Sequence, residues 1–540
     1  MDDTFMLITA WLQTDPKQSV EDRMMESFNH VGVSITITSL TNLIAFVVGT
    51  ITPFPAIYYF CCYILVSIVI CFIFQITLFA GCMALFGRLE EKNRHSIIPW
   101  ITVVSTTKAS DKNWLYRFLF TADLDVEKES SKPEMSWINI FFRDYIGGIL
   151  TNRWVMGIVL SSYFFYIGFG IYGISRIEEQ FKMKLLVRQD SYAFQAFDVY
   201  NHVFTEYKFL VELTFNGTAD YSDPKIQDEV KDIISQIEAI PYVAEAELTW
   251  SWLKSYQNFQ NDSRTSVLLS SFNMTTKEGF MRGLKEIFFR FPFGRIFNKD
   301  VVFTDDGNDI KTTRYFIIIK TLKSKVQAKD FFLRIQKIKS SSKTFQISAY
   351  NQIFYLFEQY TVIKANMFQS VGMATAVVLA VVALLTPSVM SCVCVAVGVL
   401  SIEAGVLGFM TFWDIELDVI VMVCLIMCIG LSVDYVSHIS CAYVSCTADD
   451  SKEKIKHALQ YTGFPIIQSC LSTFFGVVVV FFHPSFFFYN TTKDIVLMLI
   501  FAVYHSIFIF PIIFHLIDTH GKRTKTLEVT KPPITNGLSA

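Results

Sequence analysis

A few ionisable side chains lie inside long apolar stretches of this sequence, where a charge is energetically costly. Asp434 lies in the run Gly430-Leu-Ser-Val-Asp434-Tyr435, and His438 follows it by four residues. Residues four apart share one face of a helix, so the carboxylate and the imidazole are neighbours there. Such a pair can exchange a proton. The pattern predicts an ion or proton relay formed by Asp434, Tyr435 and His438, with Gly430 allowing a neighbouring helix to approach closely.

Glu403 is a second isolated acid, in Ser401-Ile-Glu403-Ala-Gly405, and is a candidate member of the same relay. The alternative for both acids is a structural role, in which hydrogen bonds inside a helix bundle satisfy them. The sequence has no nucleophile elbow, phosphate-binding loop, metal-ligand cluster or paired catalytic carboxylates in a soluble segment. We therefore expect no enzyme activity, no metal and no cofactor.

The composition is that of a membrane protein. Of 540 residues, 52% are hydrophobic and only 18% are charged. The formal net charge of −3 argues against nucleic acid as a partner. All 11 cysteines lie in or beside apolar stretches, so any soluble domain must fold without disulfides.

The long apolar runs predict eight membrane-crossing helices, because about 20 apolar residues span the hydrocarbon core of a bilayer. Two runs, 31–87 and 365–402, are long enough for two crossings and are divided by prolines, at Pro53 and Pro55 and at Thr386-Pro387-Ser388. The other four predicted crossings are residues 154–175, 417–443, 463–482 and 495–516. Residues 1–12 have the pattern of the end of a further helix, and no cleavable signal peptide is expected.

Lysine and arginine are concentrated in 88–152, in the turn at 452–456 and in the tail 518–540, which predicts a cytoplasmic position for all three. Residues 176–364 then lie outside, and glycosylation patterns at Asn216, Asn261 and Asn273 agree with this. Strand-like and helix-like stretches alternate in that segment, which predicts a split βαβ, ferredoxin-like α+β domain. The expected strands are 209–215, 242–249, 312–321 and 344–350, and the expected helices are 224–239 and 326–339.

An internal repeat relates the two ends of the chain. At a constant offset Asp3 falls on Asp434, Gly32 on Gly463 and Pro53 on Pro484. In both copies a helical hairpin with proline at its outer turn follows the acid. Many transporters are built from repeated halves.

Several motifs resemble the C-terminal half of patched-related (patched domain-containing) proteins of the resistance-nodulation-division superfamily. They are Gly408-Phe-Met-Thr-Phe-Trp413, Glu416-Leu-Asp418, the run from Gly430 to His438, and Gly463-Phe-Pro-Ile-Ile-Gln468. Near the other end, Gly32-Val-Ser-Ile-Thr-Ile-Thr-Ser-Leu-Thr41 is similar to the closing part of that family's sterol-sensing domain. The resemblance covers nearly the whole chain.

The resemblance implies a polytopic helix bundle with one α+β extracytoplasmic domain. Its parts would be the end of the sterol-sensing domain with helices five and six (1–87), a cytoplasmic linker (88–152), helix seven (153–175), the extracytoplasmic domain (176–364), helices eight to twelve (365–517) and a cytoplasmic tail (518–540). The chain would begin near the end of helix four, as a fragment of a longer transporter or as a shortened form.

The same resemblance implies sterol or lipid transport coupled to protons or cations. The acids of the family's two Gly-x-x-x-Asp motifs would be Asp434 on helix ten and either Asp2 or Asp3 on helix four. The alternative is a non-transporting sterol-sensing or lipid-sensing receptor or regulatory protein. Membrane lipids are the expected partners, and a protein ligand at the extracytoplasmic domain is possible. The tail carries no retention signal, so we expect the plasma membrane.

Overall fold

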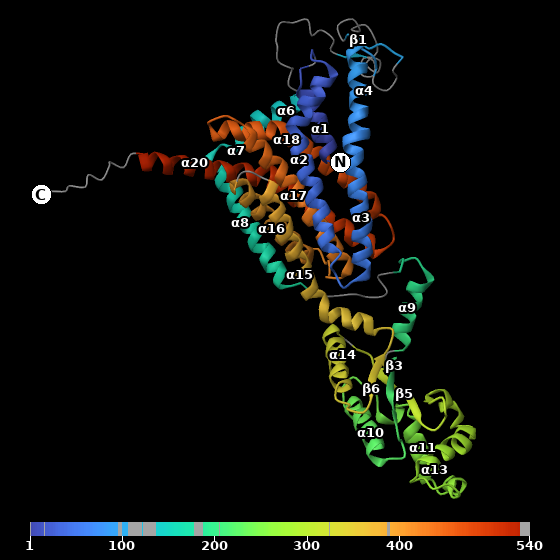
Figure 1. Ribbon diagram of the computed structural model, residues 1–540. Coiled ribbons are helices and arrows are strands. Elements are labelled where there is room, and N and C mark those ends of the chain that lie inside the picture. The colour runs from blue at the N-terminus through green and yellow to red at the C-terminus, as the bar shows by residue number, and fades with distance from the viewer. Residues whose placement is uncertain are drawn as a thin grey trace, which may run out of the picture. The chain divides into compact units, whose positions relative to one another are not determined.

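The computed structural model describes residues 2–15, 17–95, 100–105, 121–122, 137–177, 187–204, 206–322, 324–385 and 389–529. The chain divides into two compact units (Figure 1). The helical unit combines Met1–Glu178 with Ala365–Ala540, and the α+β unit is Glu179–Lys364.

Eight helices among the described residues are long and apolar enough to cross a membrane, which confirms the expected number. They are α2 (Val20–Gly49), α3 continued by η1 and α4 (Pro55–Phe74, Gln75–Phe79, Ala80–Glu91), α8 (Arg153–Ser175), α15 (Phe354–Leu385), α16 (Val389–Phe412), α17 (Val419–Ser445), α18 (Ser451–Phe481) and α19 continued by η8 and α20 (Phe486–Tyr504, His505–Ile509, Phe510–Val529). Shorter elements of this unit are α1 (Asp2–Gln13), β1 (Val104–Ser105), β2 (Thr121–Ala122), α6 (Trp137–Ile140), η2 (Phe141–Ile146) and α7 (Gly147–Leu150).

Proline separates the first two long helices as predicted. α2 ends at Gly49, and α3 starts with Pro55 in its first turn, where the missing N–H of proline breaks no helical hydrogen bond. The second predicted break, at 386–388, lies outside the described residues, between the end of α15 and the start of α16. α18 continues through Pro465 without interruption.

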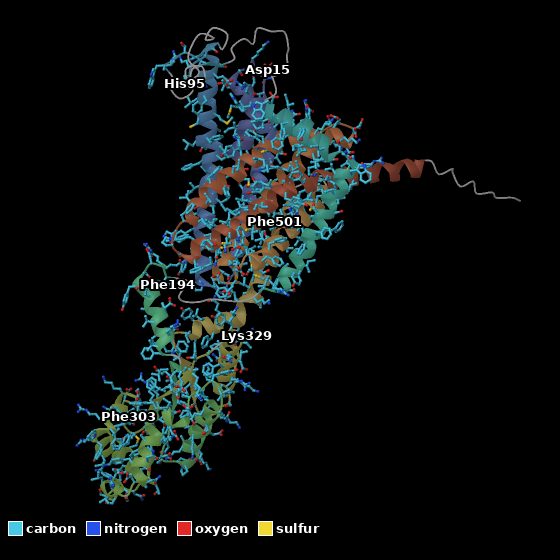
Figure 2. The ribbon with its side chains drawn as sticks, turned by 180° about the vertical axis from the view of Figure 1, so that it is seen from behind. Asp15, His95, Phe194, Phe303, Lys329 and Phe501 are labelled. Carbon is cyan, nitrogen blue, oxygen red and sulfur yellow. The ribbon has the colours of Figure 1, made fainter. Side chains whose placement is uncertain are left out.

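α17, the helix of Asp434, lies at the centre of the helical unit. In its apolar window 72% of residues are buried, against 11% for the continuous helix Pro55–Glu91. It packs against α2, α16, α18 and α19. Aromatic rings fill the bundle beside it: Phe501, labelled in Figure 2, lies with its ring centroid 4.9 Å from that of Tyr166 on α8.

α8 and α16 approach so closely that their backbones touch at glycines. A methyl group at Gly173 would lie 2.1 Å from the carbonyl oxygen of Gly408, and one at Gly408 would lie 2.1 Å from that of Gly170. Small residues at such positions permit close packing of membrane helices, where dispersion contacts replace the hydrophobic effect.

Gly173→Ala is therefore expected to lower the free energy of unfolding by about 1–3 kcal/mol, since the added methyl must push the two helices apart. Gly168→Ala on the same helix is the matched control, because its methyl would meet no atom within 4 Å. The measurement is the apparent Tm of the full chain in detergent. Equal Tm values for the two variants would refute the close packing of α8 on α16.

The α+β unit is built on a four-stranded antiparallel sheet in the order β4-β5-β3-β6. Its strands are β3 (Tyr207–Ala219), β4 (Val301–Phe303), β5 (Ile310–Lys320) and β6 (Gln346–Tyr350), and its longer helices are α9 (Tyr192–Val203), α10 (Pro224–Glu238), α11 (Trp252–Asn261) and α14 (Lys325–Lys339). Buried residues alternate along β5, and the apolar faces of α10 and α14 join one core with the sheet. The predicted strands at 209–215, 312–321 and 344–350 and both predicted helices are confirmed.

The predicted strand at 242–249 is wrong. That segment makes only one isolated bridge to β5, Val243↔Ile319, and a second follows just beyond it, Trp250↔Phe316, after a 3-10 turn, η4 (Ala246–Leu248). Alanine and glutamate favour extended pairing weakly, so this stretch does not sustain a ladder. The sheet edge is completed by β4, after an insertion that contains α11, α12 (Ser266–Leu269) and α13 (Lys277–Arg282). The ferredoxin-like plan is thus present with a broken edge strand.

Candidate functional site

Asp434 is buried in the helical unit and is held by an amide from another helix. Its side chain is 7% exposed. Nδ2 of Asn42, on α2, donates to both carboxylate oxygens, at 3.0 and 2.9 Å. A hydrogen bond to an ionised carboxylate is about twice as strong as one between neutral groups. The charge state of Asp434 therefore affects how firmly α2 is bound to α17.

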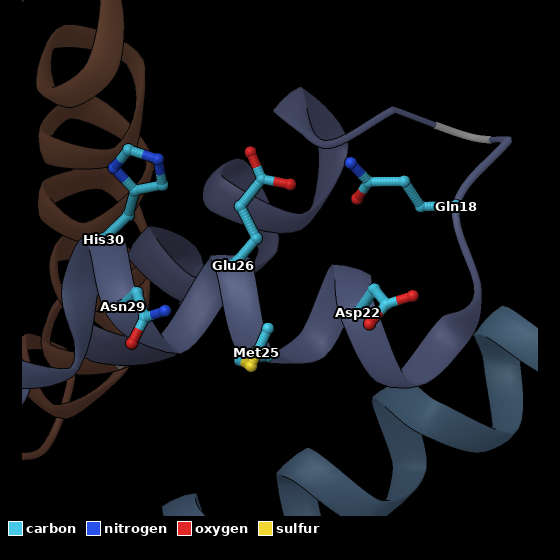
Figure 3. A pocket seen from close by; sticks show the side chains of 6 residues that line it. All are labelled: Gln18, Asp22, Met25, Glu26, Asn29 and His30. Atoms are coloured by element: carbon cyan, nitrogen blue, oxygen red, sulfur yellow. The ribbon is translucent and has the colours of Figure 1, made fainter.

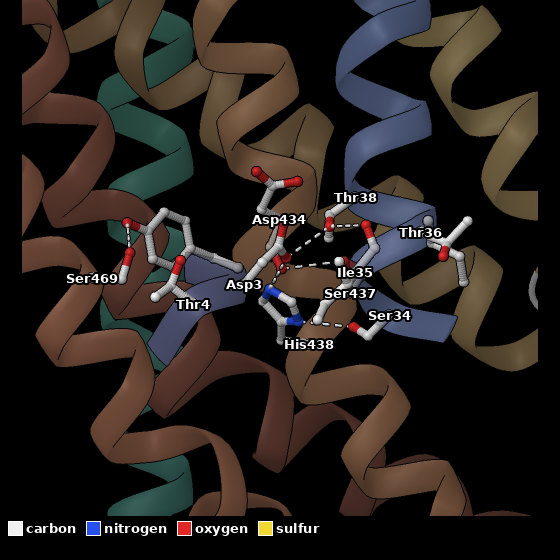
Figure 4. Close-up of polar contacts among 12 residues, drawn as sticks. Asp3, Thr4, Ser34, Ile35, Thr36, Thr38, Asp434, Ser437, His438 and Ser469 are labelled. Atoms are coloured by element: carbon white, nitrogen blue, oxygen red, sulfur yellow. Dashed lines mark hydrogen bonds and ion pairs between the residues drawn. The ribbon is translucent and has the colours of Figure 1, made fainter. Parts of the chain in front are cut away.

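His438 and Asp3 complete this group, and Figure 4 shows them beside Asp434. The imidazole is 2% exposed, and its Nδ1 lies 2.8 Å from Oγ of Ser34 on α2. Its Nε2 lies 4.0 Å from Oδ1 of Asp3 on α1, which also accepts a hydrogen bond of 3.0 Å from Oγ1 of Thr38. Four ångströms exceeds a direct hydrogen bond, so proton transfer between the imidazole of His438 and the carboxylate of Asp3 needs a small movement or one bridging water.

Gly430 makes room for the amide that holds Asp434. A methyl group at this position would lie 2.1 Å from Oδ1 of Asn42. The absence of a side chain at Gly430 thus leaves space for Asn42 of α2, the residue that donates to Asp434. Tyr435 lies one position beyond the acid, and its hydroxyl is 3.2 Å from Oγ of Ser469, linking α17 to α18 (Figure 4).

The two other predicted relay acids have different positions. Asp2 lies in α1, but its side chain is outside the part of the chain that the structure describes. Glu403 is 3% exposed on α16. Among the described residues no hydrogen bond or ion pair joins Glu403 to Asp3, His438 or Asp434. The structure therefore assembles Asp3, Asp434 and His438 and leaves Glu403 apart.

Two functional candidates were missed from the sequence. Asn42 follows Ser34 and Thr38 at intervals of four residues, so the three side chains share one face of α2, and this spacing is a signal that the sequence contains. Asp494 directly precedes the apolar run 495–516 and is 0% exposed on α19. Asp494 was not selected from the sequence, because an acid at the edge of an apolar run normally reaches water.

The three predicted glycosylation sites are exposed side chains of the α+β unit. Asn216 lies in β3 and its Oδ1 accepts a hydrogen bond from Thr312, while Asn261 ends α11 and Asn273 precedes α13. Glycosylation itself stays a prediction.

A surface hollow of about 620 Å³ at the start of α2 is separate from the Asp434 group (Figure 3). It is lined by Gln18, Asp22, Met25, Glu26, Asn29 and His30. All but Gln18 belong to one helix, and four of the five helical side chains are exposed. We assign no chemistry to this open surface.

The long apolar helices, the buried acid and histidine, and the α+β unit are features of a multi-pass integral membrane protein. Residues 1–85 match the family model described as "Patched SSD". The chain is 25% identical, over 96% of its length and 56% of the relative's, to "Patched-related protein 9" of Caenorhabditis elegans. It is 22% identical to "NPC intracellular cholesterol transporter 1" of Sus scrofa, over 98% of this chain and 44% of that protein.

Among solved structures, the chain is similar to the hedgehog release protein Disp from the water bear Hypsibius dujardini. The TM-score is 0.60 at 13% identity, over 96% of this chain and 62% of that one. This likeness supports the fold alone. The chain spans about half the length of the curated relatives it matches. Together the comparisons confirm the resemblance to patched-related proteins with a sterol-sensing domain.

Proposed function

We propose that the protein moves a sterol or another lipidic molecule across or within the membrane and couples this movement to protons through Asp3, His438 and Asp434. The observation that carries the proposal is that the buried acid Asp434 and the buried imidazole of His438, both on α17, meet the partly exposed acid Asp3 of α1 against one polar face of α2. Intramembrane groups of this kind are costly and mark ion or proton pathways. The names of two relatives, a patched-related protein and a cholesterol transporter, support a lipidic substrate.

The hydrogen bonds of α2 suggest how a proton would be converted into movement. Asn42 and Thr38 of α2 donate to Asp434 and Asp3. When either acid takes up a proton, its bond to α2 loses the charge-assisted part of its strength. α2 is then freer to shift against α1 and α17, and small helix shifts of this type drive switching in many proteins.

We further place the α+β unit on the extracytoplasmic side, with glycans on Asn216, Asn261 and Asn273, and the protein in the plasma membrane. The excess of lysine and arginine in 88–152 and in the tail supports this orientation. Residues 88–152 would be the cytoplasmic linker. A protein ligand would bind the exposed α+β unit.

A sterol-sensing receptor that does not transport is the second candidate, and the match of residues 1–85 to the sterol-sensing domain favours it. The full chain, reconstituted in liposomes with a fluorescent sterol, separates the two. A transporter moves sterol faster under an imposed pH gradient and loses this acceleration when a protonophore removes the gradient. Sterol binding without gradient-dependent movement would reject the transporter in favour of the sensor.

A further inference from the structure

Two buried carboxylates of the helical unit take no part in the group around Asp434. Glu403 on α16 is 3% exposed and Asp494 on α19 is 0% exposed. Within the described residues, neither oxygen of either side chain has a hydrogen-bond partner. Isolated buried acids of this kind are rare, because a buried polar group normally finds a partner.

The two acids lie in neighbouring helices at different depths. α16, α17 and α19 pack against one another. Glu403 lies nine residues before the end of α16 and Asp494 eight residues after the start of α19, so each is roughly 12–14 Å from its helix end. Nζ of Lys493 donates to the carbonyl oxygen of Trp413, just beyond α16, at 3.1 Å. This contact places the end of α16 beside the part of α19 that carries Asp494, whereas the hydrogen bond between Ser401 and His505 places Glu403 beside the far end of α19.

The cation next in sequence, Lys493, forms no hydrogen bond with the described carboxylate oxygens of Asp494, although its charge lies within electrostatic range of the acid. The ammonium group of Lys493 turns to Trp413 and lies 4.3 Å from the ring centroid of Tyr489. On α17, the groups facing the acids are the buried thiols Cys424 and Cys428, and Cys428 lies within electrostatic range of both carboxylates. Asp418, which caps α17, is a further acid within electrostatic range of Asp494.

The remaining groups near Glu403 are neutral. Tyr166 of α8 donates to the carbonyl oxygen of Ser401, at 2.8 Å. His505 lies 2.7 Å from the carbonyl oxygen of Phe501 through Nδ1 and 2.7 Å from Oγ of Ser401 through Nε2. A neutral ring that donates from Nδ1 and accepts at Nε2 satisfies both contacts.

An ionised carboxylate without a partner is strongly destabilising in such an interior, and a bound proton removes most of this penalty. We propose that Glu403 and Asp494 are two further proton-binding positions, inside the bundle of α16, α17 and α19, and that both carry a proton in this packing. They are separate from the Asp434 group: Asp434 lies six residues after Cys428, about 240° around α17, and contacts α2. The inference goes beyond the proposed function, because it requires no lipid movement.

Infrared spectroscopy tests the proposal, since the carbonyl stretch of a protonated carboxyl is resolved from that of a carboxylate. The sample is the full chain in liposomes at neutral pH. We expect E403Q and D494N each to remove one component of the protonated-carboxyl band, and the double variant to remove both. E453Q is the matched control, because Glu453 is exposed and paired with Lys456 at 2.8 Å; it should reduce only the carboxylate band.

The proposal is overturned if E403Q and D494N reduce the carboxylate band and leave the protonated band unchanged. Where a variant does not fold, as judged by gel filtration, the wild-type chain is treated with dicyclohexylcarbodiimide, which modifies protonated carboxyls in apolar surroundings. Modified peptides that contain Glu403 and Asp494 support the proposal. Modification confined to other acids rejects it.

Discussion

Replacement of Asp434 by asparagine is expected to slow proton-driven sterol movement about 10²-fold, the scale on which loss of a proton-transferring side chain usually acts. Asparagine has nearly the shape of aspartate but takes up no proton. Its Oδ1 can still accept from Nδ2 of Asn42, which lies 3.0 Å from Oδ1 of the acid, so the bundle should remain folded. The measurement is the initial rate of sterol movement in liposomes under an imposed pH gradient.

Two controls make the loss interpretable. E453Q removes an exposed acid that is ion-paired with Lys456 on the surface of α18, and should transport at the wild-type rate. Sterol binding by D434N should equal that of the wild type, because Asp434 is buried and asparagine keeps the hydrogen bond from Asn42 that joins α2 to α17. An unchanged transport rate in D434N would remove Asp434 from the coupling mechanism.

The membrane helices were predictable because their signal is local. About 20 consecutive apolar residues suffice to identify a crossing, whatever the rest of the chain does. The hairpin of α2 and α3 follows from Pro53 and Pro55 in the same way, since proline lacks the N–H that a continuous helix requires. The isolated acids Asp434 and Glu403 were also visible, because a charge stands out within an apolar run.

The partners of those acids were not predictable, because they come from distant parts of the chain. Asn42 and Asp434 are 392 residues apart in sequence and in hydrogen-bond contact in space. Lys493 and Asp494 show the converse: sequence adjacency suggests an ion pair, whereas Lys493 donates to Trp413. Periodicity shows which face of a helix is polar, but not which helix it meets.

The broken edge strand in the α+β unit has a similar cause. Residues 242–249 have the local pattern of a strand, yet a β-strand is completed only by its neighbour. Here Val243 and Trp250 each form one isolated bridge to β5, and β4 pairs with β5 along the same edge after the insertion. The choice between the two segments is made by tertiary packing.

Gly430→Ala is expected to abolish most sterol movement and to lower the free energy of unfolding by about 1–3 kcal/mol, the usual cost of overpacking. The added methyl would lie 2.1 Å from Oδ1 of Asn42, so the amide must rotate or α2 must retreat. Either movement breaks the bonds of 3.0 and 2.9 Å that Nδ2 donates to Asp434. The measurements are the transport rate under a pH gradient and the apparent Tm in detergent.

Gly476→Ala on α18 is the matched control, since its methyl would meet no atom within 4 Å. It tests whether an added methyl in a membrane helix is harmful in itself. Gly476→Ala should therefore keep the wild-type rate and Tm. Equal losses in the two glycine variants would show that contact with Asn42 is not the cause.

A double-mutant cycle with Asn42→Ala identifies the clash directly. Asn42→Ala alone removes the donor from Asp434 and should also impair transport. In that background Gly430→Ala has no amide to displace, so its further cost in stability should nearly vanish. The coupling between the two sites should then fall in the range of about 0.5–3 kcal/mol that contacting residues show. Strictly additive losses would mean that Gly430 acts through another neighbour, and that the amide of Asn42 does not depend on the glycine.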